Sequence, residues 1–316
     1  MPFRILGGLV LLLALVASWT APRNASGHDK AEAKTAEPKK VPCPYGTDHA
    51  KPLEPKEKVV SKVDDHTLLR VEFNGIKGDR VPAYLYVPKR KGANAPFPAV
   101  LLQYGSGGSK KTDYIVAIGK QFVGRGYVVL TIDSPNQGER RKENNNAGGL
   151  GLASAEVVMH YCGDYSRAVD FLSSRREVDK ERLGYVGISW GAITGITYVA
   201  YDQRIRAMGS LIGGGNFLGL YSAKLAEKIA LEGSKSSDPV CHVARIAPRP
   251  LLFINVTKDQ LIQKSWAESL HKAAGAGSKV VWLETDHYFK GVDRSKVCDS
   301  VIDFMDEKLP VKKMTR

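Results

Sequence analysis

One serine in the second half of the sequence has the setting that nucleophilic catalysis requires. Ser189 is the central residue of Gly187 to Gly191 (GISWG), which matches G-x-S-x-G. In that pattern the glycines allow a sharp turn from a strand to a helix, and the serine stays exposed. The apolar run LGYVGI precedes the turn and AITGITYVAY follows it, so strand, turn and helix occur in this order. We therefore predict Ser189 as a nucleophile rather than as part of a chance turn of small residues.

A serine hydroxyl becomes a good nucleophile only when a base removes its proton, and that base is normally a histidine. His287 comes directly after the apolar run KVVWLE, at the end of the last expected strand. His242 precedes the run LLFINV and is the main rival. The other five histidines fall in a polar segment, before the early strands or within helical patterns: His28, His49, His66, His160 and His271. We predict His287 as the general base.

The carboxylate that orients the histidine should also follow a strand. Asp259 does so, three residues after LLFINV. Asp286 is too close to His287 along the chain to reach its ring, and Asp293 enters the next helical pattern. We therefore predict Asp259 as the orienting acid, a role that is compatible with capping the following helix. The order Ser, Asp, His is typical of enzymes with the G-x-S-x-G turn and differs from the order in the two major serine-protease folds.

Acyl transfer also needs two backbone N–H donors where the oxyanion develops. Trp190, directly after the nucleophile, is one candidate, and Ser106 in the loop YGSGGS is the other. This glycine-rich loop satisfies neither G-x-G-x-x-G nor G-x-x-x-x-G-K-[ST], which argues against a phosphate cradle.

The elements that position these residues alternate between strand and helix. Residues 81–87 alternate apolar and polar positions and predict an early antiparallel strand. Continuous apolar runs predict strands buried on both faces, as in a parallel sheet, at 99–103, 127–132, 183–188 and 251–256, with two more strands at 207–212 and 279–284. Helical patterns cover 114–123, 155–172, 192–201, 261–274 and 292–308. The expected fold class is α/β, with a mostly parallel central sheet and helices on both faces.

The composition is that of an ordinary globular protein. The 316 residues are 43% hydrophobic and 25% charged, with a formal net charge of +13. Attraction to an anionic polymer is one interpretation of this charge. The better interpretation is that scattered lysines and arginines solvate the surface, because no dense basic block interleaved with aromatic residues occurs. For the same reason a nucleic-acid partner is not expected.

The N-terminus has the features of an export signal. Arg4 precedes the apolar run Ile5 to Val16 and then small residues, and the run is shorter than the ~20 residues of a membrane-spanning helix. We expect a signal peptide at 1–27, with the cleavage site left open, a polar linker at 28–58 and the folded domain at 59–309. The expected location is secreted or periplasmic with no stable membrane span after cleavage, and an uncleaved N-terminal anchor is the alternative.

The four cysteines of an exported chain allow two disulfides or four free thiols. If bridges form, we favour Cys162 with Cys241 and Cys43 with Cys298. Cys162 with Cys298 is the least expected pair, because their helices should cover opposite faces of the sheet.

Several segments together resemble the α/β-hydrolase superfamily, and within it the dienelactone-hydrolase-like and acetyl-xylan-esterase-like branches. They are VPAYLYVPK, LLQYGSGG, DSPNQGER (Asp133 to Arg140), GISWG and the acid and histidine loops, and the resemblance extends from Val71 to Phe304. It implies carboxylic ester hydrolysis without a cofactor or metal. Two positions depart from the family pattern. Tyr104 replaces a usual histidine, and a serine in place of a cysteine nucleophile argues against true dienelactone hydrolase activity.

The resemblance also places a lid or cap at 213–247, although a single helix packed on the sheet fits that segment equally well. Four side chains are candidates for the substrate pocket: Tyr104, Asn216, Phe217 and Tyr221. Asp133, Gln137 and Gly138 correspond to a loop that is mainly structural in relatives.

Together these features predict a secreted serine hydrolase that cleaves a small-molecule or polysaccharide ester through an acyl-enzyme. A prolyl-oligopeptidase-like peptidase is an alternative, although no propeller-like repeat precedes the domain. A non-catalytic binding module on the same fold is the other, and it usually lacks one member of the triad. The oligomeric state stays open.

Overall fold

The structure is a computed structural model, and it describes residues 43–89, 96–141, 155–217 and 236–309. Its centre is a nine-stranded sheet with the order β1-β2-β3-β5-β4-β6-β7-β8-β9. The strands are β1 (Lys56–Lys62), β2 (His66–Asn74), β3 (Arg80–Pro88), β4 (Phe97–Gln103), β5 (Val128–Ile132), β6 (Val178–Ile188), β7 (Ile205–Leu211), β8 (Leu251–Val256) and β9 (Ser278–Leu283). From β5 to β9 all neighbours are parallel, and β1, β2 and β3 add antiparallel strands at one side.

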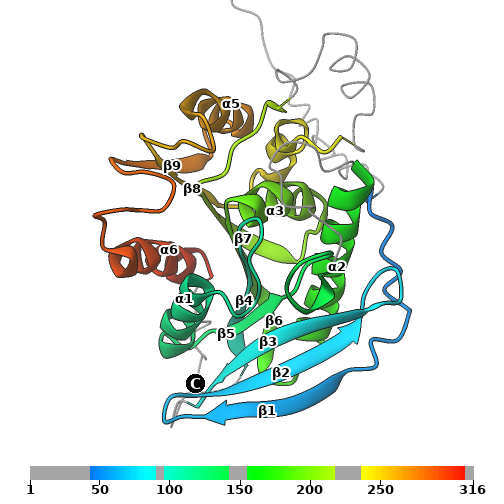
Figure 1. The fold of residues 1–316 in the computed structure, drawn as a ribbon. Coiled ribbons are helices and arrows are strands. Elements are labelled where there is room, and N and C mark those ends of the chain that lie inside the picture. Colours follow the sequence, from blue (N-terminus) through cyan, green and yellow to red (C-terminus); the bar gives the residue numbers. More distant parts are fainter. Residues whose placement is uncertain (1–42, 90–95, 142–154, 218–235, 310–316) are drawn as a thin grey trace, which may run out of the picture. The chain divides into compact units, whose positions relative to one another are not determined.

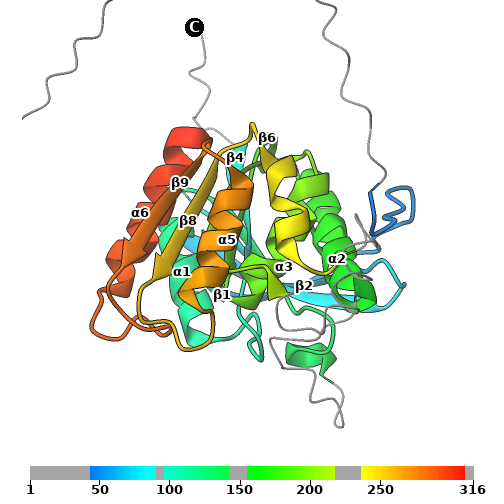
Figure 2. The same ribbon diagram turned by 90° about the horizontal axis from the view of Figure 1, so that it is seen from above.

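Helices cover both faces of this sheet (Figures 1 and 2). One face carries α1 (Asp113–Gly124) and α6 (Arg294–Lys308), and the other carries α2 (Ala155–Ser173), α3 (Trp190–Tyr201) and α5 (Lys264–Ala274). In the connections that the structure describes there are three short 3₁₀ helices, η1 (Gly138–Arg140), η4 (Pro239–Cys241) and η5 (Val243–Ile246). The predicted fold class is confirmed.

Two hydrophobic clusters form the core, one on each side of the sheet. The first joins α2, α3 and α5 to the strands, and the second joins α1 and α6 to the opposite side. Every residue of β5 and of β8 is buried, which explains why these strands are apolar runs without alternation. The parallel strands thus hold their carboxyl ends in one row, where the following loops meet.

The predicted elements recur with shifts of a few residues, and residues 81–87 do form an antiparallel strand, within β3. The edge strand β1 and its neighbour β2 were missed. β1 is exposed at nearly every position, so its sequence KEKVVSK carries no apolar pattern. Its partner β2 has mostly half-buried positions.

Residues 43–58 differ from the expected linker. Tyr45 is buried and its hydroxyl donates to the Tyr198 carbonyl at 3.0 Å, while β1 already begins at Lys56. The polar composition predicted a linker, but one buried aromatic ring packs this segment against the domain. The expected signal peptide at 1–27 and the first part of the linker lie outside the described residues.

The four cysteines are free, so the favoured disulfide pairs are wrong. Cys162 belongs to the cluster under α2 and Cys298 to the cluster under α6, which places them on opposite faces as expected. Cys43 and Cys241 are exposed. The bonds inferred from export are therefore not part of this structure.

Among the described helices, none combines the length and apolar character needed to cross a bilayer.

Candidate active site

Ser189 occupies a strained turn between β6 and α3. Its backbone has φ 52° and ψ −114°, a conformation that side-chain-bearing residues rarely adopt, and its N–H donates to the Leu211 carbonyl of the neighbouring strand at 2.8 Å. A Cβ at Gly187 would lie 2.3 Å from the Gly191 carbonyl oxygen, and one at Gly191 would lie 2.7 Å from the Tyr104 carbonyl oxygen. Both flanking glycines are therefore required by close backbone packing, as the pattern predicts.

The three predicted side chains come together at the carboxyl ends of the strands. His287 Nε2 lies 3.1 Å from Ser189 Oγ, and His287 Nδ1 lies 2.8 and 2.9 Å from the two carboxylate oxygens of Asp259. A carboxylate only accepts hydrogen bonds, so in the neutral imidazole Nδ1 carries the proton and Nε2 is left to accept from the serine. All three side chains are buried. The order and direction of these bonds suit proton transfer from Ser189 to His287.

The carboxylate of Asp259 is held by backbone as well as by the histidine. Its Oδ1 accepts from the N–H groups of Leu261 and Ile262, both at 2.8 Å. These bonds close a turn before α5, which begins at Lys264 rather than at the predicted residue 261. Asp259 therefore fixes a turn and orients His287 at the same time.

The rivals for these roles are engaged elsewhere. The ring of His242 is buried between the Ser236 carbonyl (2.8 Å) and the Tyr201 hydroxyl (3.1 Å). Asp286 accepts from the backbone of Tyr288 and Lys290, which makes it part of the histidine loop's own turn. Asp293 caps α6. None of the three is part of the Ser189–His287–Asp259 chain of hydrogen bonds.

The loop after β4 passes beside the nucleophile. A Cβ at Gly105 would lie 3.2 Å from Ser189 Cβ and 3.6 Å from its Oγ. The Gly105 N–H donates to the Tyr114 hydroxyl at 2.9 Å, and burial raises the pKa of that hydroxyl. Ser106 is exposed and follows directly. Tyr114, the second residue of α1, was missed because nothing in the sequence links its hydroxyl to this loop.

Trp190 begins α3, so its N–H is among the first four of the helix, which have no acceptor within it. These groups and the helix dipole favour negative charge near Ser189. The indole ring packs edge-on against Tyr161, with ring centroids 6.2 Å apart, and the Tyr161 hydroxyl donates to the Pro135 carbonyl at 3.0 Å. The start of α3 is thereby fixed against α2.

A buried ion pair anchors the loop after β4 to the loop after β5. The ammonium of Lys110 and the carboxylate of Asp133 are fully buried and in contact, and Lys110 also pairs with Glu139 at 2.7 Å. Arg70, followed by Lys110, lowers the pKa of Glu139 to about 2. A Cβ at Gly138, where φ is 55°, would lie 2.2 Å from the Asp133 carboxylate carbon. The role expected for Asp133 and Gly138 is thus structural, but the part played by Lys110 was missed.

The candidate pocket residues have different settings. Tyr104 is buried and its hydroxyl accepts from the Ser134 N–H at 2.9 Å, so its ring supports the loop instead of lining an open pocket. Asn216 is exposed, with φ 67°, and its N–H donates to Asp238. Phe217 packs edge-on against Trp266 of α5. Tyr221 and most of the expected lid lie outside the described residues.

Tyr288 is the exposed aromatic residue next to the histidine. Its ring meets the His287 ring edge-on, with centroids 5.6 Å apart, and 64% of its surface is accessible. Leu261, beside Asp259, is also exposed. Both side chains thus lie close to triad residues in the sequence and expose apolar surface.

One group of side chains has the composition of a metal site. Asp79, His160 and Asp164 hold their ligand atoms within 4.8 Å of one another. The guanidinium of Arg140 lies between the carboxylates, 2.5 Å from Asp79 and 2.7 Å from Asp164. Because this cation already balances the carboxylates, the group does not call for a metal ion.

The sheet, the strained serine turn and the hydrogen-bonded Ser-His-Asp set define an α/β-hydrolase fold. The family model of the dienelactone hydrolase family matches residues 81–300, and the chain belongs to this family. The chain is 32% identical over 140 residues to the uncharacterized protein PA2218 of Pseudomonas aeruginosa (44% of this chain, 35% of the relative). It is 31% identical over 153 residues to the putative hydrolase YtaP of Bacillus subtilis (44% and 49%). The matched segments thus span half or less of these relatives.

Among solved structures, acetyl xylan esterase 1 from Thermoanaerobacterium sp. is similar in fold. The TM-score is 0.65 at 17% identity, and the alignment covers 84% of this chain and 90% of that protein. The likeness supports the strand order and the arrangement of helices described above.

Proposed function

We propose that this protein is a secreted carboxylic ester hydrolase that works through a Ser-His-Asp acyl-enzyme mechanism. The observation that carries the proposal is the continuous chain from Ser189 Oγ through His287 to Asp259, with separations of 3.1 Å and 2.8 Å. It begins at a serine whose strained backbone holds the hydroxyl at the carboxyl edge of the sheet.

In the first step Ser189 Oγ attacks the ester carbonyl and its proton moves to His287 Nε2. Asp259 stabilises the resulting imidazolium and stays ionised. The imidazolium then protonates the leaving alcohol, which gives the acyl-enzyme. A water molecule, deprotonated by the same nitrogen, attacks the acyl carbonyl and regenerates the serine.

The oxyanion of each tetrahedral intermediate needs backbone donors. The N–H of Trp190 is one, because it begins α3 beside the nucleophile. Ser106 is the other on the grounds of position, since it follows Gly105, which lies against Ser189, and the Gly105 N–H is engaged by Tyr114. Two such donors account for a large share of the rate enhancement in acyl transfer.

Family and fold support an ester as the substrate. Acylated polysaccharides are the class we favour, since a structural neighbour is an acetyl xylan esterase and the leader expected at 1–27 would carry the enzyme out of the cytoplasm. N-terminal sequencing of the mature protein tests the leader separately, and an intact Met1 in the extracellular or periplasmic fraction contradicts it.

The test of activity is hydrolysis of p-nitrophenyl esters from acetate to palmitate, acetylated xylan and a peptide substrate. We expect turnover of short esters, and a loss of about 10⁵-fold or more in kcat for Ser189→Ala. Ser210→Ala is the matched control, because Ser210 is a buried serine of the adjacent strand β7. Full activity of Ser189→Ala, or cleavage of the peptide alone, would overturn the proposal.

A further inference from the structure

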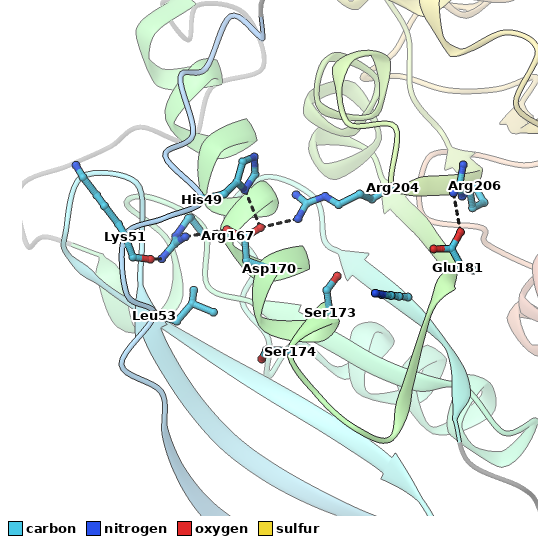
Figure 3. A pocket seen from close by; sticks show the side chains of 11 residues that line it. His49, Lys51, Leu53, Arg167, Asp170, Ser173, Ser174, Glu181, Arg204 and Arg206 are labelled. Atoms are coloured by element: carbon cyan, nitrogen blue, oxygen red, sulfur yellow. Dashed lines mark hydrogen bonds and ion pairs between the residues drawn. The ribbon is translucent and has the colours of Figure 1, made fainter.

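A second candidate site lies at the opposite end of the parallel strands. A cavity of about 530 Å³ is walled in part by Lys180 and Glu181 near the start of β6 and by Arg206 near the start of β7 (Figure 3). Ser189 follows the other end of β6. Because each strand residue rises about 3.3 Å, the run from Glu181 to Ile188 separates the cavity from the nucleophile by roughly 20 Å.

The cavity wall carries more cations than anions. Five basic side chains line it against two carboxylates: Lys51, Arg167, Lys180, Arg204 and Arg206 against Asp170 and Glu181. Asp202, which is outside this lining set, pairs with Arg204 at 2.6 Å, so the excess is two positive charges when His49 is neutral. Lining charges of one sign concentrate counter-ions in a concave site. The arrangement therefore favours a ligand with more than one negative charge.

The two carboxylates are already engaged. Asp170 pairs with Arg204 at 2.5 Å and with Arg167 at 2.8 Å, as Figure 3 shows. Glu181 pairs with Arg206 at 2.9 Å. Lys180 forms no ion pair with any described residue, so its ammonium is available to a ligand.

One serine on the cavity wall, Ser173, is the last residue of α2. Ser173 Oγ is buried and has no hydrogen-bond partner among the described residues. Figure 3 places Ser173 between Asp170 and Glu181 on the cavity wall. Because the Ser173 oxygen is covered by protein atoms, a ligand in the cavity does not contact it, and Lys180 and Arg206 are the donors that a ligand can reach.

One feature opposes an anion here. The helix α2 ends at Ser173, and the carboxyl end of a helix carries about half a negative charge. The excess of two positive charges is about four times larger, so the net field of the cavity stays positive.

We propose that this cavity binds a phosphate or sulfate group. A dianion matches the excess charge and can accept from Lys180 and from the half-exposed Arg206. The volume lies within the range of about 300–1,000 Å³ for small-molecule sites and leaves room for a sugar that carries the group. The proposal is independent of ester hydrolysis, because the cavity and Ser189 lie at opposite ends of the parallel strands.

Isothermal titration of the full chain at low ionic strength tests this proposal. The probes are glucose 6-sulfate, glucose 6-phosphate, inorganic sulfate, inorganic phosphate and glucose. We expect one molecule of the sugar esters to bind per chain, no binding of glucose, and a Kd that rises with added salt. Tighter binding of the esters than of the inorganic ions identifies an anion carried on a carbohydrate, and equal binding identifies the free ion.

The double variant Lys180→Glu/Arg206→Glu should weaken this binding at least tenfold and leave turnover of p-nitrophenyl acetate unchanged. The matched control is Lys120→Glu on α1, an exposed lysine on the other side of the sheet, with an expected change below twofold. Circular dichroism checks that both variants fold. No binding of any anion by wild type, or an equal loss in Lys120→Glu, would overturn the proposal.

Discussion

The two ends of the parallel strands both carry close pairs of charged side chains, and one pair from each end shows what burial changes. At the carboxyl end the side chains of Lys110 and Asp133 are fully buried, and the Asp133 carboxylate also accepts from the backbone N–H groups of Lys110 and Glu139. At the other end Arg206 and Glu181 are 48% and 51% exposed. A buried ion pair holds the backbone around it in place, because breaking the pair leaves an unpaired charge that water cannot reach. An exposed ion pair contributes little to the free energy of unfolding, and its charged groups stay accessible to ligands.

The largest effect that follows concerns the acid of the triad. Asp259→Asn keeps an oxygen that can accept from Leu261 and Ile262, but it no longer enforces the proton on His287 Nδ1. We expect kcat to fall by about 10²–10⁴-fold with little change in stability. Steady-state hydrolysis of p-nitrophenyl acetate measures the fall. Asp286→Asn, in the next loop, is the control and should keep most of the activity.

The buried pair gives the largest expected effect on stability. Lys110→Met leaves the Asp133 carboxylate without its cation, which should lower the free energy of unfolding by about 3–5 kcal/mol. Urea denaturation followed by tryptophan fluorescence measures the change. Lys111→Met is the matched control, because Lys111 is 59% exposed and 3.8 Å from Glu139. Equal losses in the two variants would remove the distinction between buried and exposed pairs.

A buried histidine without an ion-pair partner gives an intermediate effect on stability. Burial lowers the pKa of His271 in α5 to about 4, and its Nε2 lies 2.9 Å from Asn255 Oδ1. Below pH 6.5 the unfolded chain binds this proton more readily than the folded chain does, so stability falls as the pH drops from 6.5 to 4.

Allowing for the partial exposure of this ring, we expect His271 to account for a loss on the order of 1–2 kcal/mol between pH 6.5 and 4. In His271→Gln the dependence should be flatter over the same range, as measured by urea denaturation at several pH values. An unchanged slope in that variant would show that His271 is not the titrating group.

The smallest effect concerns the exposed pair. Arg206→Gln removes the charge that faces Glu181 and should change the free energy of unfolding by less than about 0.5 kcal/mol. Thermal denaturation of this variant and of Glu181→Gln measures it. A loss of unfolding free energy comparable to that of Lys110→Met would mean that the Arg206–Glu181 pair is needed for folding rather than for binding.

The sequence predicted those parts of the molecule that depend on local pattern. Ser189, Asp259 and His287 each follow an apolar run, and the parallel sheet brings the ends of such runs together. For the same reason the parallel strands and the helices that cover them were predicted, whereas β1 and β2 were not. The arrangement of glycines around Ser189 follows from close backbone packing that G-x-S-x-G encodes.

The sequence did not predict features that depend on tertiary contacts between unlike segments. Lys110 reaches Asp133 across two loops, and Tyr114 reaches Gly105 from a different element. Neither side chain differs in type from many surface residues. Tyr104 was placed in the pocket by its position in a motif, but its hydroxyl has a backbone partner that only the folded loop provides.

Labelling with a fluorophosphonate, followed by peptide mass spectrometry, tests the central claim most directly. We predict one adduct per chain on Ser189, formed by wild type and by Lys120→Glu and absent from Ser189→Ala. The adduct requires a nucleophilic serine next to its base, which the 3.1 Å contact with His287 supplies. An adduct on another residue, or none while ester hydrolysis persists, would contradict the account.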